Sequence, residues 1–122
     1  MQHIYRKIRG IPYSQHKRQG NIDGLRVWTE AVVQQTRNLP RVRQACIAKV
    51  TFLLPENKYP PNFPNGSDLD NLLKRFFDAL NKTVFSEAPG KDSCVISLHV
   101  SKVRVKSDNK AGALLEILPV TV

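Results

Sequence analysis

The sequence predicts an α+β fold, a single domain over residues 1–122 with a mixed sheet and two helices in the order β-α-β-α-β-β. Its length of 122 residues is that of one domain. Two segments have the apolar period of a helix, and four have the pattern of a strand. No internal repeat, linker or low-complexity segment divides the sequence, so all six elements are expected to share one core.

The N-terminal segment is predicted to be a strand followed by a basic loop. Residues 2–11 alternate roughly, with Ile4 and Ile8 among polar neighbours, which is typical of a strand. Residues 13–20 are basic and have no apolar period, so we expect a loop there.

A helix and a buried strand follow. Residues 21–37 carry Leu25, Trp28 and Val32 on one side of a helix, which ends before a proline. Residues 45–54 form a nearly continuous apolar run, which indicates a well-buried strand.

The most informative segment is residues 67–80, in which apolar side chains recur at helical spacing over three turns. Ser67 and Asp70 have the spacing of a capping box, which predicts that the helix starts there. Asp70, Lys74 and Asp78 fall on one stripe beside the apolar face. The stripe is compatible with an ordinary solvated helix surface, and also with a polar site.

The remaining segments are two loops and two strands. We expect loops at residues 55–66, which contain four prolines, and at residues 81–91. Residues 93–105 and 113–120 follow strand patterns. The turn at residues 107–112 joins them, so a C-terminal β-hairpin is expected.

The charge distribution points to a polyanionic partner. The formal net charge is +9, which favours nucleic acid, although a merely basic soluble protein has the same balance. Residues 1–67 hold eleven Lys or Arg residues and three acidic ones, whereas residues 68–92 hold four basic and five acidic residues. Carboxylates weaken phosphate binding, but a metal-dependent enzyme acting on phosphodiesters requires them.

Other function classes find little support. Cys46 and Cys94 lack metal-ligand or redox spacing and are interpreted as small buried hydrophobic residues. The chain shows no signal segment and no stretch that would span a membrane, so we expect a cytoplasmic protein with no membrane partner and no organic cofactor.

Asp92 extends the acidic segment to a third element. If the strand at residues 93–105 packs beside the helix, Asp92 approaches Asp68 and Asp70. Three clustered carboxylates repel one another, and a divalent cation such as Mg²⁺ relieves the repulsion. Lys74, one turn after Asp70, can stabilise charge on a reacting phosphate or orient Asp70. Alone, this spacing is a weak signal, because Asp-x-Asp is frequent.

The same residues resemble a known family. The segments DLDNLLK at 68–74, FDAL at 77–80 and DSxV at 92–95 are similar to the signature of the RusA Holliday junction resolvases, of prophage origin. The resemblance covers residues 67–95. It implies a small homodimeric, Mg²⁺-dependent endodeoxyribonuclease of DNA recombination and repair, which resolves four-way DNA junctions by paired symmetric nicks.

The resemblance also implies residue roles. Asp68, Asp70 and Asp92 match the family's catalytic, metal-binding aspartates, and Lys74 matches its catalytic lysine. Asp78 is assigned a structural role, an i,i+4 pair with Lys74.

Six basic residues outside the signature are candidate DNA contacts, although a solvated surface explains each equally well. They are Lys17, Arg18, Arg41, Arg43, Lys102 and Arg104.

The chain departs from the family pattern in three places. Lys91 stands where the family commonly has a second acidic residue, the loop before Asp92 is longer, and Pro12-Tyr13-Ser14-Gln15 replaces Pro-Ser-x-Asn. Two alternatives therefore stay open: a catalytically silent DNA-structure-binding protein of the same fold, and a nuclease that is less selective for junctions.

Overall fold

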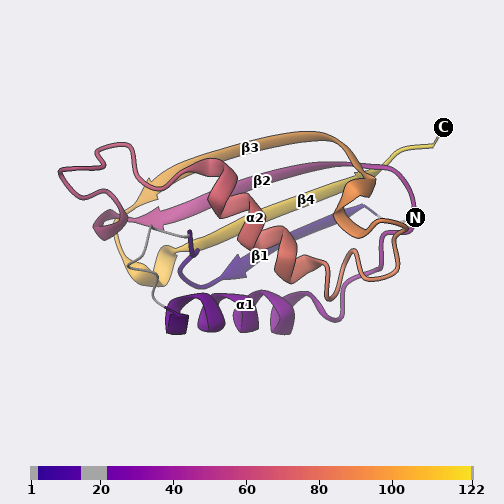
Figure 1. Cartoon of the computed structure of the whole chain (residues 1–122), viewed down its shortest axis with the longest axis horizontal. Helices are drawn as coiled ribbons and strands as arrows, with labels where there is room; N and C mark the ends of the chain where they lie inside the picture. The colour runs from indigo at the N-terminus through magenta and orange to yellow at the C-terminus, as the bar shows by residue number, and fades with distance from the viewer. Residues whose placement is uncertain (1–2, 15–21, 122) are drawn as a thin grey trace.

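The structure, a computed structural model, describes residues 3–14 and 22–121. Within these residues the α+β prediction is confirmed, with two α-helices and a mixed four-stranded sheet (Figure 1). The elements are β1 (Ile4–Arg9), α1 (Ile22–Thr36), β2 (Cys46–Pro55), α2 (Leu69–Leu80), β3 (Val95–Val105) and β4 (Gly112–Pro119).

The sheet has the strand order β1-β4-β2-β3, and this order corrects the expected C-terminal hairpin. β3 and β4 are not neighbours: β4 pairs antiparallel with both β1 and β2, whereas β3 pairs parallel with β2. The short 3-10 helix at Asp108–Lys110 packs against β2 as the chain passes from the edge strand β3 into the centre.

The side chains explain which strand is central. On the face of β4 that packs into the core, Ala113, Leu115 and Ile117 are all buried. The same face of β3 begins with apolar residues but ends with Lys102 and Arg104. Charged side chains at core-facing positions are tolerated at a sheet edge, where their ends reach solvent, but not in the centre.

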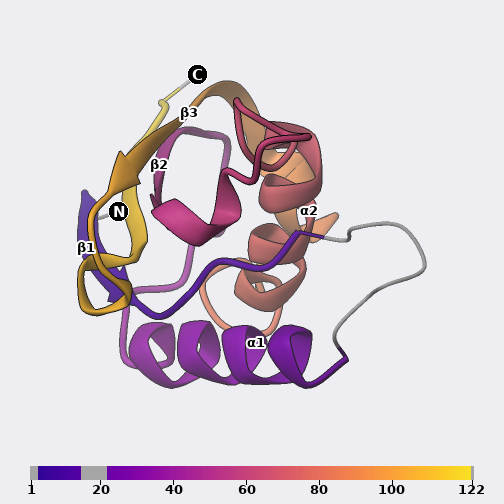
Figure 2. The same cartoon turned by 90° about the vertical axis from the view of Figure 1, so that its left-hand side faces the viewer.

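Both α-helices cover the same face of the sheet (Figure 2), α1 beside β1 and α2 beside β3. Trp28 of α1 and Phe76 of α2 stack with their ring centroids 6.1 Å apart, and Phe52 of β2 meets the Phe76 ring edge-on. As predicted, Trp28 and Val32 are buried core residues. No described helix has the length and apolar character needed to cross a membrane.

The segment between α2 and β3 was expected to be a loop, and it also contributes to the core. Thr83, Val84 and Phe85 are buried. The Val42 N–H donates to the Val84 carbonyl at 2.9 Å, and the Thr36 and Thr83 hydroxyls lie 2.7 Å apart. These contacts hold the segment that carries the chain from α2 to Asp92.

The two cysteines lie together although they are far apart in the sequence. The sulfur atoms of Cys46 and Cys94 are 3.9 Å apart, and both are free thiols. Burial, together with the neighbouring Cys94, raises the pKa of Cys46 to about 12. Cys46 is fully buried and Cys94 half-buried, in agreement with their interpretation as packing residues.

Candidate active site

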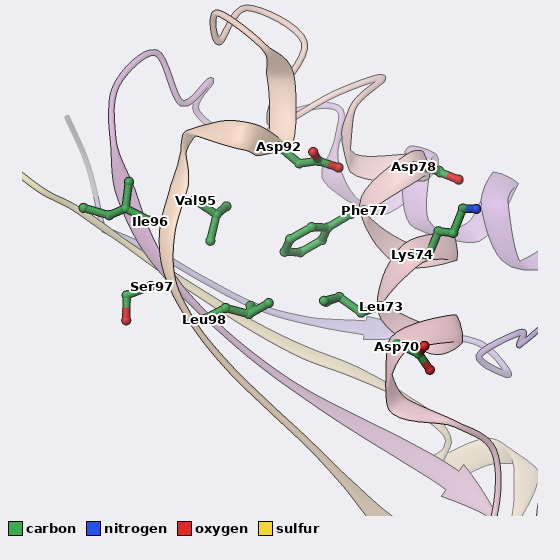
Figure 3. A pocket seen from close by; sticks show the side chains of 10 residues that line it. All are labelled: Asp70, Leu73, Lys74, Phe77, Asp78, Asp92, Val95, Ile96, Ser97 and Leu98. Atoms are coloured by element: carbon green, nitrogen blue, oxygen red, sulfur yellow. The ribbon is translucent and has the colours of Figure 1, made fainter.

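A surface hollow of about 370 Å³ lies between α2 and the first residues of β3 (Figure 3). Its apolar part is formed by Leu73 and Phe77, which point from α2 towards Val95 and Leu98 of β3. The lining residues are Asp70, Leu73, Lys74, Phe77, Asp78, Asp92, Val95, Ile96, Ser97 and Leu98. The hollow therefore combines an apolar wall with three carboxylates and one ammonium group.

The helix α2 presents its charged residues because its apolar face is committed to the core. Leu72 and Phe76 are fully buried, whereas Asp70, Lys74 and Asp78 are exposed. The expected ion pair between Lys74 and Asp78 is absent, and within residues 22–121 Lys74 has no carboxylate within 4.0 Å. Its ammonium group is thus free to meet a substrate charge.

The start of α2 also differs from the prediction. The N-cap residue is Asp68 rather than Ser67, and its side chain makes no capping hydrogen bond. The Asp70 carboxylate accepts a local hydrogen bond of 3.0 Å from the Asn71 N–H. The capping box is therefore wrong, and the exposed Asp68 carboxylate is not used to stabilise the helix end.

Asp92 reaches the hollow from a tight reversal of the chain. Gly90 and Lys91 both have left-handed backbone conformations, with φ of 74° and 54°; Gly90 is the N-cap of the short 3-10 helix η3 (Lys91–Cys94), and Lys91 is its first residue. Asp92 is half-buried and is hydrogen-bonded to Asn81. The segment between α2 and Asp92 thus ends in a defined turn that directs Asp92 towards α2 (Figure 3).

The structure brings some of the predicted site residues together. Asp70, Lys74 and Asp92 line one hollow, whereas Asp68 is not among its lining residues. In the part of the chain that the structure describes, no group of three or more His, Cys, Asp or Glu side chains is close enough to hold a metal ion. Among the described residues, Asp70, Asp78 and Asp92 thus line the hollow without forming a closed set of three metal ligands.

Two of the candidate DNA contacts are engaged within the protein. Lys102 Nζ donates to the Ser67 carbonyl at 2.7 Å, directly before Asp68. The Arg104 guanidinium lies over the Tyr59 ring, 4.2 Å from its centroid, and donates at 3.4 Å to a main-chain carbonyl of the same loop. Burial raises the pKa of the Tyr59 hydroxyl, and the Arg104 charge opposes that rise. Both basic residues therefore hold the proline-rich loop that leads into α2.

The other candidate DNA contacts have different surroundings. Arg41 donates to the Leu39 carbonyl at 3.1 Å, and Arg43 forms an exposed ion pair with Glu87. Two more candidates, Lys17 and Arg18, lie outside the described residues.

A comparison with known families finds a match over most of the chain. The family described as endodeoxyribonuclease RusA matches residues 22–117, from the first residue of α1 into β4. The chain belongs to the RusA endodeoxyribonuclease family. RusA proteins are hydrolases that cut DNA, and the family acts on branched DNA junctions. The family match confirms the resemblance to the RusA signature that the sequence shows. A comparison with curated proteins found no match.

Asn81 is the residue at this site that the sequence reasoning missed. The sequence predicts only a loop at this position, yet the Asn81 side chain makes two hydrogen bonds with Asp92. Its position directly after the FDAL segment was the available signal, because a residue that ends a helix can bond the chain that returns beside it.

Proposed function

We propose that this RusA family member is a Mg²⁺-dependent endonuclease that resolves four-way DNA junctions by paired symmetric nicks. The observation that carries the proposal is the convergence of Asp70 and Asp92, from two different elements, on one hollow beside Lys74. In a chain of net charge +9, such acidic residues suit phosphodiester hydrolysis better than simple phosphate binding.

The chemistry of the two carboxylates fits Mg²⁺. This ion is commonly held by one or two carboxylates, while substrate phosphates and water complete its octahedral coordination. Asp70 and Asp92 would hold it, and Asp68 at the exposed N-cap of α2 is the third candidate ligand. When bound, the metal would polarise the scissile phosphate and acidify the attacking water.

Lys74 is assigned to the phosphate. It projects from the same helix as Asp70, lies at the hollow, and is not neutralised by a described carboxylate. An ammonium group there would stabilise the negative charge that develops on the phosphoryl oxygens. Replacing Lys74 by methionine is expected to lower the cleavage rate more than junction affinity.

The proposal includes a homodimer, and the face of the sheet that the helices leave uncovered supports it. Four large apolar side chains lie exposed on the face opposite the helices, namely Tyr5, Ile47, Val103 and Leu118. Four strands about 4.8 Å apart and about 30 Å long make a face of roughly 500–600 Å² in projection. A stable interface buries about 800 Å² per partner, so a second copy packed on this face would approach that size.

The homodimer is tested by its solution mass and products. Leu118→Glu is expected to give monomers, because it places an uncompensated charge in the proposed interface. Such monomers would nick junctions once and lose the paired cuts, since a two-fold dimer matches a two-fold substrate. A wild-type protein that is monomeric at micromolar concentration contradicts the dimer.

A second function has one observation in its favour. Lys91 replaces an acidic residue common in the family and lies beside Asp92, where a positive charge competes with a divalent cation. A catalytically silent protein would bind junctions tightly and cut nothing in any metal. A less selective nuclease would cut flaps and junctions equally.

One cleavage assay separates these functions. A synthetic four-way junction and a linear duplex of the same sequence are incubated with Mg²⁺ or with chelator. Symmetric, metal-dependent nicks on the junction alone are expected. Asp70→Asn should reduce cutting by more than about 100-fold, because even partners of metal ligands contribute 10–100-fold, while binding persists. Asp108→Asn, at an exposed remote acid, is the matched control.

The six candidate DNA contacts are tested together by salt dependence. Each true phosphate contact that is removed should reduce the slope of log affinity against log salt by about 1. For Lys102 and Arg104, which bond the loop before α2, an unchanged slope with weaker cutting would indicate an indirect role.

A further inference from the structure

Asn81 and Asp92 are joined by two reciprocal hydrogen bonds. Asn81 Nδ2 donates to the Asp92 carboxylate oxygen Oδ2 at 3.1 Å, and the Asp92 backbone N–H donates to Asn81 Oδ1 at 3.1 Å. The two residues are eleven positions apart, one directly after α2 and the other in η3. Both are half-buried, so water competes with these bonds less than it would at the surface.

The chemistry of the pair permits only one orientation of the amide. A backbone N–H can only donate, so it must meet the amide oxygen, and a carboxylate can only accept, so it must meet the amide nitrogen. Rotating the Asn81 amide by 180° would break both bonds. Asn81 therefore fixes both the main chain and the carboxylate of Asp92 with one side chain.

The carboxylate needs such a partner. Asp92 follows two left-handed residues at the end of a ten-residue series of turns, and a carboxylate rotates easily about its last bond. With Oδ2 bonded to Asn81, the second oxygen, Oδ1, has no hydrogen-bond partner among the described residues and remains available as an acceptor, and Asp92 is one of the residues that line the hollow. Groups that hold a ligating carboxylate in this way raise metal affinity, because less rotational freedom is lost on binding.

Resting on the proposed function, we propose that Asn81 is a positioning residue, which holds the Asp92 carboxylate with one oxygen available to the divalent cation. If Asn81 had only a structural role, it would hold the main chain between α2 and Asp92 and would have no effect on metal binding. The two roles differ in what a substitution changes: a structural residue affects the free energy of unfolding, whereas a positioning residue affects metal affinity in protein that is fully folded.

The test uses Asn81→Ala and Asn81→Ser, the second in case the first fails to fold, together with Asp92→Ala and the double variant with Asn81→Ala. Asn38→Ala is the matched control, because Asn38 is an exposed asparagine that also follows a helix end. Mn²⁺ binding to the free protein is measured by electron paramagnetic resonance. The Mg²⁺ concentration for half-maximal junction cleavage and urea unfolding are measured in parallel.

Loss of Asn81 is expected to weaken Mn²⁺ binding about 10-fold and to raise the half-maximal Mg²⁺ concentration by a similar factor. Because Asn81 acts through Asp92, the double variant should bind Mn²⁺ no more weakly than Asp92→Ala alone. Asn38→Ala should match the wild type in both measurements.

Two results overturn the inference and are distinguishable from failure of the proposed function. If the wild type cuts junctions with Mg²⁺ but both Asn81 variants, while folded, keep its metal affinity, Asn81 is structural and the function stands. If the Asn81 and Asp92 effects add, Asn81 does not act through Asp92. A wild type that neither binds Mn²⁺ nor cuts in Mg²⁺ overturns both the function and the role of Asn81.

Discussion

Replacing Thr36 or Thr83 by valine tests how the segment before Asp92 is attached to the helices. Thr36 is fully buried and Thr83 nearly so, and their hydroxyl oxygens are 2.7 Å apart. The Thr36 hydroxyl has a single hydrogen, which it donates to the Val32 carbonyl at 2.7 Å. The hydrogen between the two threonines must therefore come from Thr83.

Because Thr83 is the donor and Thr36 the acceptor, the two substitutions should lower the free energy of unfolding by different amounts. Thr83→Val removes one neutral hydrogen bond while Thr36 keeps its donor bond, so it should destabilise the protein by about 0.5–1.5 kcal/mol. Thr36→Val leaves the buried Thr83 hydroxyl without an acceptor, so it should destabilise by about 1–3 kcal/mol. In the double variant no unpaired hydroxyl remains, so its loss should be smaller than the sum of the two single losses by about 1 kcal/mol.

Urea unfolding of the four proteins measures these free energies, with an unchanged denaturant dependence required for comparison. Thr51→Val is the control, because the Thr51 hydroxyl is only half-buried and lies 3.4 Å from Ser101; its effect should stay within about 0.5 kcal/mol. Equal losses for the two single variants, or losses that simply add, would refute the assigned direction of the bond.

Three further predictions concern the core and the sheet. Phe76→Ala should destabilise the protein by about 3–5 kcal/mol in urea unfolding, because it empties the space beside Trp28; a loss below about 1 kcal/mol would show that the site collapses. Cys46 should resist iodoacetamide at pH 8 in the native state and react in urea, because its raised pKa keeps it a neutral thiol. The same shift should lower stability as the pH rises from about 9 towards 12, since only the unfolded state ionises there; rising stability would contradict the shift. Gly112→Ala should unfold at markedly lower urea concentration, because the added Cβ would lie 2.1 Å from the Ile8 carbonyl oxygen; an unchanged midpoint would mean that β1 can move away.

The helices were predictable because their period is local. Each helix carries apolar residues at the spacing that places them on one face, and these residues are buried. Examples are Trp28 and Val32 in α1, and Leu72 and Phe76 in α2. The strands were recognisable from their apolar character for the same reason. The capping box failed because it rests on two residues, and a helix end shifts by one residue at little energetic difference.

The pairing of strands could not be read in the same way. Residues 93–105 and 113–120 are joined by a short turn, which favours a hairpin in sequence terms. Whether β4 pairs with β3 or enters between β1 and β2 depends on which strand can bury its whole core face. Lys102 and Arg104 prevent β3 from burying its whole core face, so β3 lies at the edge of the sheet. This strand order depends on all four strands together and cannot be read from any one of them.

For the candidate site, too, some features follow from the sequence and others only from the tertiary structure. The sequence alone determined the residue types, the family signature and the helix that carries Asp70 and Lys74, because these depend on neighbours along the chain. Only the tertiary structure decided that Asp92 and Asp70 line one hollow, that Asp68 lies outside its lining, and that Asn81 bonds Asp92. These are contacts between residues eleven or more positions apart, set by the packing of α2 against β3, and no local period encodes them.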